Sequence, residues 1–148
     1  ADFDQGSRDA IGNDKDTIST RDFWKRITHY DKDVEPFFEN LPVMEDAFIL
    51  MRYITENFQN YFVLTASGYT PKNVEEQKRN WAKKVFSPML KVVTVKKSLE
   101  KAQYATPKTI LIDDRSKAID PWVDAGGIGV LHTSAQNTIK QLERIVRS

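Results

Sequence analysis

Hydrophobic and polar positions in the second half of the chain alternate between a strand-like and a helix-like pattern. Four short apolar runs, each bounded by polar or turn-forming residues, are typical of buried strands. The runs are YFVLTASG (61–68), LKVVTVKK (90–97), KTILIDDR (108–115) and IGVLH (128–132). The amphipathic segments between and after them predict helices over 73–86, 98–105, 116–127 and 134–146. Strands that alternate with helices favour a parallel sheet covered by helices on both faces.

Three of these predicted helices carry further signals. Asn73 and Glu76 have the spacing of a capping box, with Asn in place of the usual Ser or Thr. Gly126 and Gly127 are expected to end the helix over 116–127. The last helix has four apolar residues on one side, which are Ile139, Leu142, Ile145 and Val146.

The first half of the chain is less regular. Its first forty or so residues are mostly polar and rich in turn-forming residues. Aromatic residues occur in two segments of this region, RDFWKRITHY (21–30) and EPFFENL (35–41). We expect one helix from a cap at Ser19 or Thr20 to about His29, and a short helix over 34–40. A longer helix is expected to start at Pro42 and to bury a broad apolar face. That face consists of Val43, Met44, Ala47, Phe48, Leu50, Met51 and Ile54.

Composition narrows the class of protein. A chain of 148 residues is long enough for one domain with a hydrophobic core. Its net charge is +1, with basic and acidic residues mixed along the chain, which does not indicate binding to duplex nucleic acid or to an anionic membrane. The chain has no cysteine, which excludes disulfides and thiolate zinc sites, and no apolar run approaches the roughly 20 residues of a membrane span. We expect a cytoplasmic protein without nucleic-acid or membrane partners. The oligomeric state is open, a homodimer included.

Polar side chains follow three of the predicted strands, at 65–67, 96–98 and 113–115. The carboxyl ends of parallel strands meet at one edge of a sheet, where ligands bind. Hydroxyl residues there commonly form turns, and a lysine pair is commonly solvated. Asp113 and Asp114 differ, because adjacent carboxylates after a buried strand repel each other unless a cation is present, and oxygen ligands favour Mg²⁺. The set predicts a phosphoryl site that still needs a nucleophile, in this chemistry an aspartate on the central strand.

VLTAS, VVTVKKS and ILIDDR, in this order and spacing, resemble the haloacid dehalogenase-like hydrolases, and more narrowly their 5'(3')-deoxyribonucleotidase branch. ADFD, DFWKRI, EPFFENLP and NWAKKVF are similar to further segments of that branch. The resemblance implies one domain with a three-layer, Rossmann-like α/β core over about 46–148 and a small helical cap over about 5–45. It also implies Mg²⁺-dependent hydrolysis of phosphate monoesters, with (deoxy)nucleoside monophosphates as the expected substrates, through an aspartyl-phosphate.

The resemblance also implies roles for single residues. Thr65 would bind the phosphate, Lys97 would stabilise its charge, and Asp113 and Asp114 would hold Mg²⁺ directly or through water. Substrate would also contact Ser67, Phe3, Phe23 and Trp24, the aromatics lining the nucleoside side of the pocket unless they belong to the core of the cap. Val95 stands where mammalian members carry an arginine, which leaves the choice of nucleotide open.

Asp2 and Asp4 look like the Asp-x-Asp pair that supplies the nucleophile and the general acid in this family. A nucleophilic aspartate follows a buried strand, however, and Ala1 cannot supply one. In the family, the pair comes just before a segment like Ala1–Phe3. We therefore expect the first core strand and its pair upstream of residue 1, in the middle of the sheet and beside the strand that ends in Asp113. Asp2 and Asp4 would take no part in the chemistry.

Three alternatives compete with this hypothesis. A catalytically inactive, phosphatase-like binding module is the main one. A nucleic-acid binder would use KRNWAKK (78–84), but the same string fits an amphipathic helix with a solvated face. A response-regulator receiver also pairs acids after such a strand, but too few residues follow Asp114, and Thr65 and Lys97 precede it in the wrong order.

Overall fold

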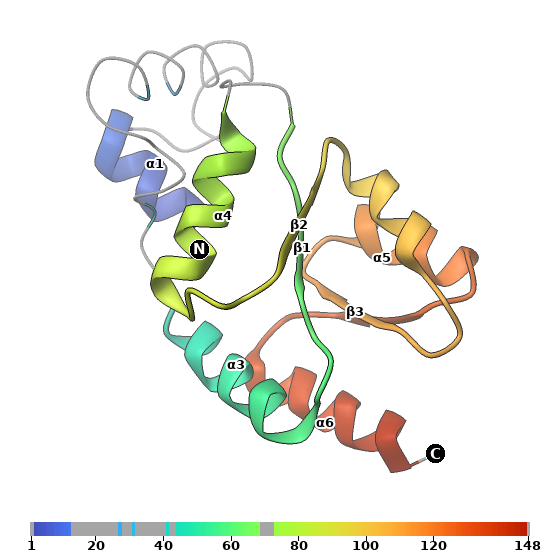
Figure 1. Cartoon of the computed structure of the whole chain (residues 1–148). Helices are drawn as coiled ribbons and strands as arrows, with labels where there is room; N and C mark the ends of the chain where they lie inside the picture. Colours follow the sequence, from blue (N-terminus) through green and yellow to red (C-terminus); the bar gives the residue numbers. More distant parts are fainter. Residues whose placement is uncertain are drawn as a thin grey trace.

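The computed structural model describes residues 2–12, 27, 31, 41, 44–68 and 73–147. Within these ranges the chain is a mixed α/β protein, as the sequence predicts (Figure 1). The α-helices are α1 (Phe3–Ile11), α3 (Glu45–Asn57), α4 (Val74–Val85), α5 (Ser116–Asp124) and α6 (Ala135–Arg147). A 3₁₀ helix, η1, spans Ser98–Tyr104, and the strands are β1 (Val63–Ala66), β2 (Val92–Val95), β3 (Ile110–Asp113) and β4 (Ile128–Leu131). All four predicted strands are confirmed.

The strands form two parallel pairs. β1 pairs with β2 from Val63↔Val92 onward, and β3 pairs with β4 from Ile110↔Ile128 onward. A crossover helix joins the strands of each pair, α4 in the first and α5 in the second, so each sheet is one βαβ unit. Among the described strands, β1 and β3 each have a partner on one side. The single three-layer sheet therefore stays a prediction.

A buried apolar cluster connects the two sheets. Leu111 of β3 and three residues of α5 form it, namely Ala118, Ile119 and Trp122. Leu64 of β1 packs against this cluster, although no strand pairing joins β1 to β3 among the described residues. The hydrophobic effect is non-directional, so side-chain burial can hold the two units together without a shared hydrogen-bond ladder.

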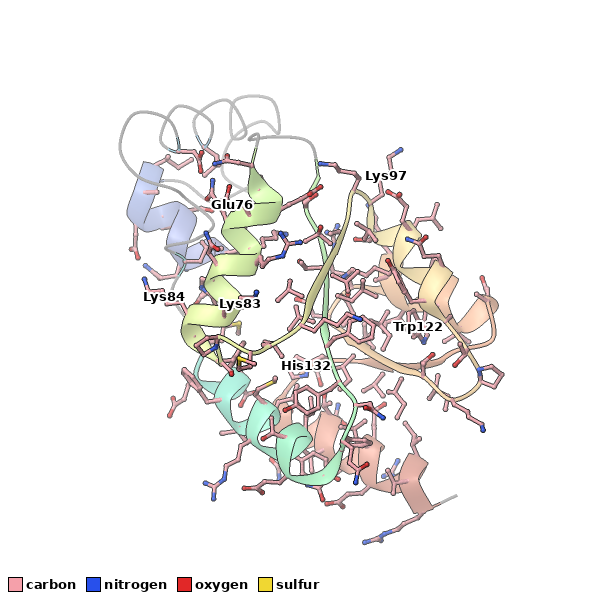
Figure 2. The ribbon with its side chains drawn as sticks, viewed as in Figure 1. Glu76, Lys83, Lys84, Lys97, Trp122 and His132 are labelled. Carbon is pink, nitrogen blue, oxygen red and sulfur yellow. The ribbon has the colours of Figure 1, made fainter. Side chains whose placement is uncertain are left out.

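The end of α5 is fitted closely around Trp122, whose side chain is labelled in Figure 2. Gly126 has a φ of 96°, a left-handed conformation that suits glycine after a helix. Gly127 lies against the indole ring, where an added Cβ would come within 2.2 Å of Trp122 Nε1. Glycine is therefore needed at the two positions for different reasons. Gly126 allows the left-handed turn, and Gly127 leaves room for the indole ring of Trp122.

The N-terminal segment differs from the prediction. The sequence indicates turns here, but residues 3–11 form the helix α1. Gly6, a residue that disfavours helices, is buried in α1 and does not break it. Asp2 is the N-cap, and its Oδ1 accepts a hydrogen bond from Gln5 N at 3.1 Å. Gly12, with a φ of 78°, ends the helix. The other helices expected before residue 41 lie largely outside the described residues, as does most of the predicted cap.

Two predictions about helix faces and caps are wrong. No residue of α3 is buried, and Met44 and Phe48 are about half exposed. Of the predicted apolar face, Met51 packs against the cluster of Ala82, Leu90 and Val92. The Asn73 side chain makes no capping bond, since its left-handed backbone (φ 61°) turns it away from the first amides of α4.

The start of α6 is capped twice. Ser134 Oγ accepts a hydrogen bond from Asn137 N at 3.1 Å. Asp46 Oδ2, from α3, accepts one from Ala135 N at 2.7 Å. A carboxylate also suits the positive end of the helix dipole. This contact fixes α3 to α6.

Among the helices of the described ranges, none has the length and apolarity that crossing a membrane requires.

Gly127→Ala should lower the free energy of unfolding by about 2 kcal/mol, because the new methyl group overlaps the Trp122 ring. Urea denaturation measures the change. The loss should be clearly smaller in a Trp122→Leu background, where the ring is absent. Equal losses in both backgrounds would show that the indole is not the cause.

Candidate functional site

A buried ion pair lies at the carboxyl end of β3. Lys101 Nζ, from η1, is 2.6 Å from Asp113 Oδ2, and the two side chains are only 8% and 9% exposed. Asp113 Oδ1 accepts a hydrogen bond from the Arg115 amide at 2.9 Å. The strand continues to pair beyond this point, since the His132 amide donates to the Asp113 carbonyl at 2.8 Å. The Asp113 carboxylate is thus held by both of its oxygens.

Lys101 is not among the residues that the sequence predicts for the site. Lys97, the predicted lysine, is exposed at the start of η1 (Figure 2). The backbone of Lys97 begins that helix: its amide donates to the Glu100 carboxylate at 2.8 Å, and its carbonyl accepts from the Glu100 amide at 3.0 Å. The spacing along the chain could have indicated Lys101, because it lies one helical turn after Lys97. The helix η1 that carries it packs on α5 and β1.

The end of β1 contributes hydroxyl and carbonyl groups. Thr65 lies opposite Thr94 in the β1–β2 register and is partly exposed. Ser67 is buried, its amide donates to the Val95 carbonyl at 2.8 Å, and its hydroxyl lies 3.3 Å from the same oxygen. Ser67 therefore extends the pairing of the two strands. Its predicted contact with substrate stays a prediction.

Lys78 of α4 reaches the end of β1. Its Nζ donates to the carbonyl of Ala66, the last residue of β1, at 2.5 Å. Burial, together with the positive charges of Lys101 and Arg115, lowers the pKa of Lys78 to about 8, while the carboxylate of Asp113 opposes this shift. Groups around the end of β3 therefore act on an ammonium bound at the end of β1.

An exposed ion pair lies near the end of β2. Lys96 Nζ is 2.7 Å from Glu75 Oε1, and both side chains are more than two-fifths exposed. The hydrogen bond and the charge of Lys96 lower the pKa of Glu75, and a hydrogen bond with Ser67 adds to this. Because the pair is in contact with water, its contribution to stability is small. It defines the outer rim of the candidate site.

The predicted magnesium ligands offer a partial donor set. Asp114 is exposed, and Asp113 is paired with Lys101. Within 2–12, 44–68 and 73–147, no group of three or more His, Cys, Asp or Glu side chains forms a metal cluster. Mg²⁺ often takes one or two carboxylates and fills its other positions with water and phosphate oxygens. The exposed Asp114 carboxylate fits a direct ligand, and the hydrogen-bonded Asp113 fits one that acts through water.

Of the three aromatic residues predicted to contact substrate, Phe3 is the one that the structure describes. Phe3 packs in a cluster around Ile27 and Val74, between α1 and α4, which is the position of a core residue. Phe23 and Trp24 lie outside the described residues. Contacts of the three residues with a nucleoside stay predictions.

A separate hollow lies at the opposite end of β1 and β2, where these strands begin. Its volume is about 490 Å³, and α3 and the segment 85–91 line it with residues that include Phe48, Met51, Phe86 and Leu90. Its lining also includes polar and basic side chains, namely Arg52, Thr55, Gln59, Ser87 and Lys91, and no carboxylate is among the described residues that line it. Ligands of parallel α/β sheets bind at the carboxyl ends of the strands, so the charged groups at those ends are the stronger candidate site.

Comparison of the chain with protein-family models, with curated proteins and with solved structures finds no match. Function is therefore inferred from the residues themselves.

Lys101→Met should lower the free energy of unfolding by about 3 kcal/mol, because it leaves the Asp113 carboxylate buried without its cation. Arg52→Met is the control. It breaks the exposed pair between Arg52 and Glu56, which should change stability by less than about 0.5 kcal/mol. Urea denaturation measures both. Equal losses in the two variants would contradict the assignment of a buried pair.

The lowered pKa of Lys78 predicts a pH dependence of stability. Between about pH 8 and the ordinary lysine value of 10.5, the unfolded chain keeps a proton that the native chain has lost. Stability from this group therefore rises with pH through that window and is lost as pH falls through 8. The difference in unfolding free energy between wild type and Lys78→Met should change by about 2 kcal/mol from pH 8 to pH 10, in favour of wild type. For Lys84→Met, on an exposed position of the same helix, the difference should stay flat.

Proposed function

We propose that this chain is part of a Mg²⁺-dependent phosphoric monoester hydrolase, similar to the 5'(3')-deoxyribonucleotidase branch of the haloacid dehalogenase-like hydrolases. Its substrates in this proposal are (deoxy)nucleoside monophosphates. The observation that carries the proposal is the set of charged groups at two strand ends that influence one another: Lys78 of α4 at the end of β1, and the Lys101–Asp113 pair at the end of β3. Converging cations and carboxylates are what phosphoryl transfer needs, because its transition state spreads negative charge over several oxygens.

The proposed roles follow from chemistry and position. Thr65, at the end of β1, would donate its hydroxyl to a phosphoryl oxygen. Lys97 would approach the phosphate from the exposed start of η1, while the buried Lys101 would hold Asp113 in place. Asp114 would bind Mg²⁺ directly and Asp113 through water. The chemistry that Mg²⁺ supplies when bound is neutralisation of charge on the phosphoryl group.

The aspartyl-phosphate route requires an aspartate, which the resemblance assigns to a strand ahead of residue 1. The strand pairing supports this part of the proposal. Among the described strands, β1 and β3 each have one paired edge, and a strand between them would satisfy the backbone groups of both free edges. Its carboxyl end would then lie beside the ends of β1 and β3, where Lys78 and Asp113 are found.

The full-length protein should release phosphate from deoxynucleoside monophosphates in Mg²⁺, stop in EDTA, and recover when excess Mg²⁺ is restored. A colorimetric phosphate assay measures the release, with a phosphodiester as the control substrate. Hydrolysis that continues in EDTA would contradict the metal role. Nucleotide binding without phosphate release would favour the inactive binding module, and neither binding nor release would contradict the proposed function as a whole.

A further inference from the structure

The hollow where β1 and β2 begin has an aromatic wall that is already in place. The Phe86 ring, which follows α4, contacts Phe48 of α3 edge to face, with the ring centroids 5.9 Å apart. It contacts Trp81 of α4 in the same way at 5.7 Å, and Trp81 Nε1 donates to the Leu41 carbonyl at 2.9 Å. Leu90, another lining residue, is buried. The wall therefore has its shape before any ligand binds, as most ligand pockets do.

Other side chains of the hollow leave apolar surface in contact with water. Phe48 is 51% exposed, Tyr61 40% and Met89 91%, and all three line the hollow. Met89 belongs to a tight turn in which the Leu90 amide donates to the Ser87 carbonyl at 3.2 Å. Single exposed hydrophobic residues are common, but a group of them around one concave surface is typical of a binding site. The volume of about 490 Å³ lies in the range of small-molecule sites.

The charged residues that line the hollow are basic. They are Arg52 of α3 and Lys91, the residue before β2. Arg52 is paired with Glu56 at 3.0 Å, but both side chains are mostly exposed, so exchange of this partner for another anion costs little. The Lys91 ammonium lies 5.4 Å from the centre of the Phe62 ring, a neutral partner. An anionic group at the hollow would therefore meet two cations beside apolar surface.

We propose that the hollow is a second binding site, whose ligand is a small amphiphilic anion with an apolar body and one carboxylate. The apolar body would pack against Phe48, Met51 and Phe86, and the carboxylate would approach Arg52 and Lys91. Burial of the apolar body supplies affinity, while the two cations select an anion over neutral and cationic analogues.

A concave surface of this volume favours a small molecule over a protein partner, which needs a broad contact area. The site is independent of the proposed function, because it lies at the amino ends of β1 and β2 and the candidate site lies at the carboxyl ends of the strands.

Three phenylalkyl ligands of equal chain length and different charge test this inference: phenylbutyrate, phenylbutanol and phenylbutylamine. The three methionines of the chain, isotope-labelled in their methyl groups, report the place of binding by NMR on the full-length protein. Met51 and Met89 line the hollow, whereas Met44 precedes α3 and is outside the lining. On titration with phenylbutyrate, the Met51 and Met89 resonances should shift and saturate while Met44 stays in place. The dissociation constant should be lowest for the carboxylate and highest for the amine.

A charge variant identifies the cation. Lys91→Gln should raise the dissociation constant of phenylbutyrate about 3-fold and leave that of phenylbutanol unchanged, because it removes charge and little apolar surface. Lys84→Gln is the matched control and should change neither, since Lys84 is an exposed lysine of α4 outside the lining (Figure 2).

The comparison of the three ligands on the wild-type protein needs no substitution at Lys91, so it decides the matter even if Lys91→Gln does not fold. Equal affinity for the three ligands would overturn the inference, as would a Met44 shift as large as those of Met51 and Met89. Absence of saturation with phenylbutyrate would overturn it too.

Discussion

The ion pair between Lys101 and Asp113 is the contact on which the candidate site depends. It joins η1, which follows the first sheet in the chain, to the end of a strand in the second sheet. Both partners are buried, so neither charge can be satisfied by water if the other moves away. The pair therefore fixes the distance between two units that share no strand pairing among the described residues, and it sets the position of the cations around Asp113.

Side-chain packing and electrostatics act in the same direction here. Leu64 of the first sheet reaches the apolar cluster of the second, while Lys78 is influenced by the charges at the end of β3. Apolar contact brings the two βαβ units together, but it is tolerant of small shifts. The charged contacts are more selective, because their energy changes steeply with distance and burial. Together they explain how two small sheets can present a common edge.

Strands were the most predictable part of this fold. Runs such as ILID are apolar, short and followed by carboxylates, and few other structures suit that pattern. α1 was missed because Gly6 is a poor helix former in isolation, and its burial is a tertiary effect that no local pattern records. The exposed face of α3 was missed for the opposite reason: periodicity shows which side is apolar, not whether another element covers it.

The position of the candidate site was easier to predict than the residues that form it. The apolar run before the paired acids predicts a strand, and β3 does end at Asp113. Choosing between Lys97 and Lys101 needs the path of η1, and Lys78 lies in a string that reads as a solvated face. The pairing of the sheets was also beyond the sequence, because a parallel connection specifies neighbours only through contacts distant along the chain.

The cap that Asp46 provides to α6 has a consequence for the order in which the protein forms during translation. The hydrogen bond spans 89 positions, so α3 leaves the ribosome long before the helix that it anchors. Until then Phe48 and Ile49 of α3, half exposed even in the finished fold, stay open to solvent together with the side that α6 later contacts. The nascent chain therefore exposes an aggregation-prone hydrophobic surface during much of its synthesis. Chaperones commonly bind such surfaces.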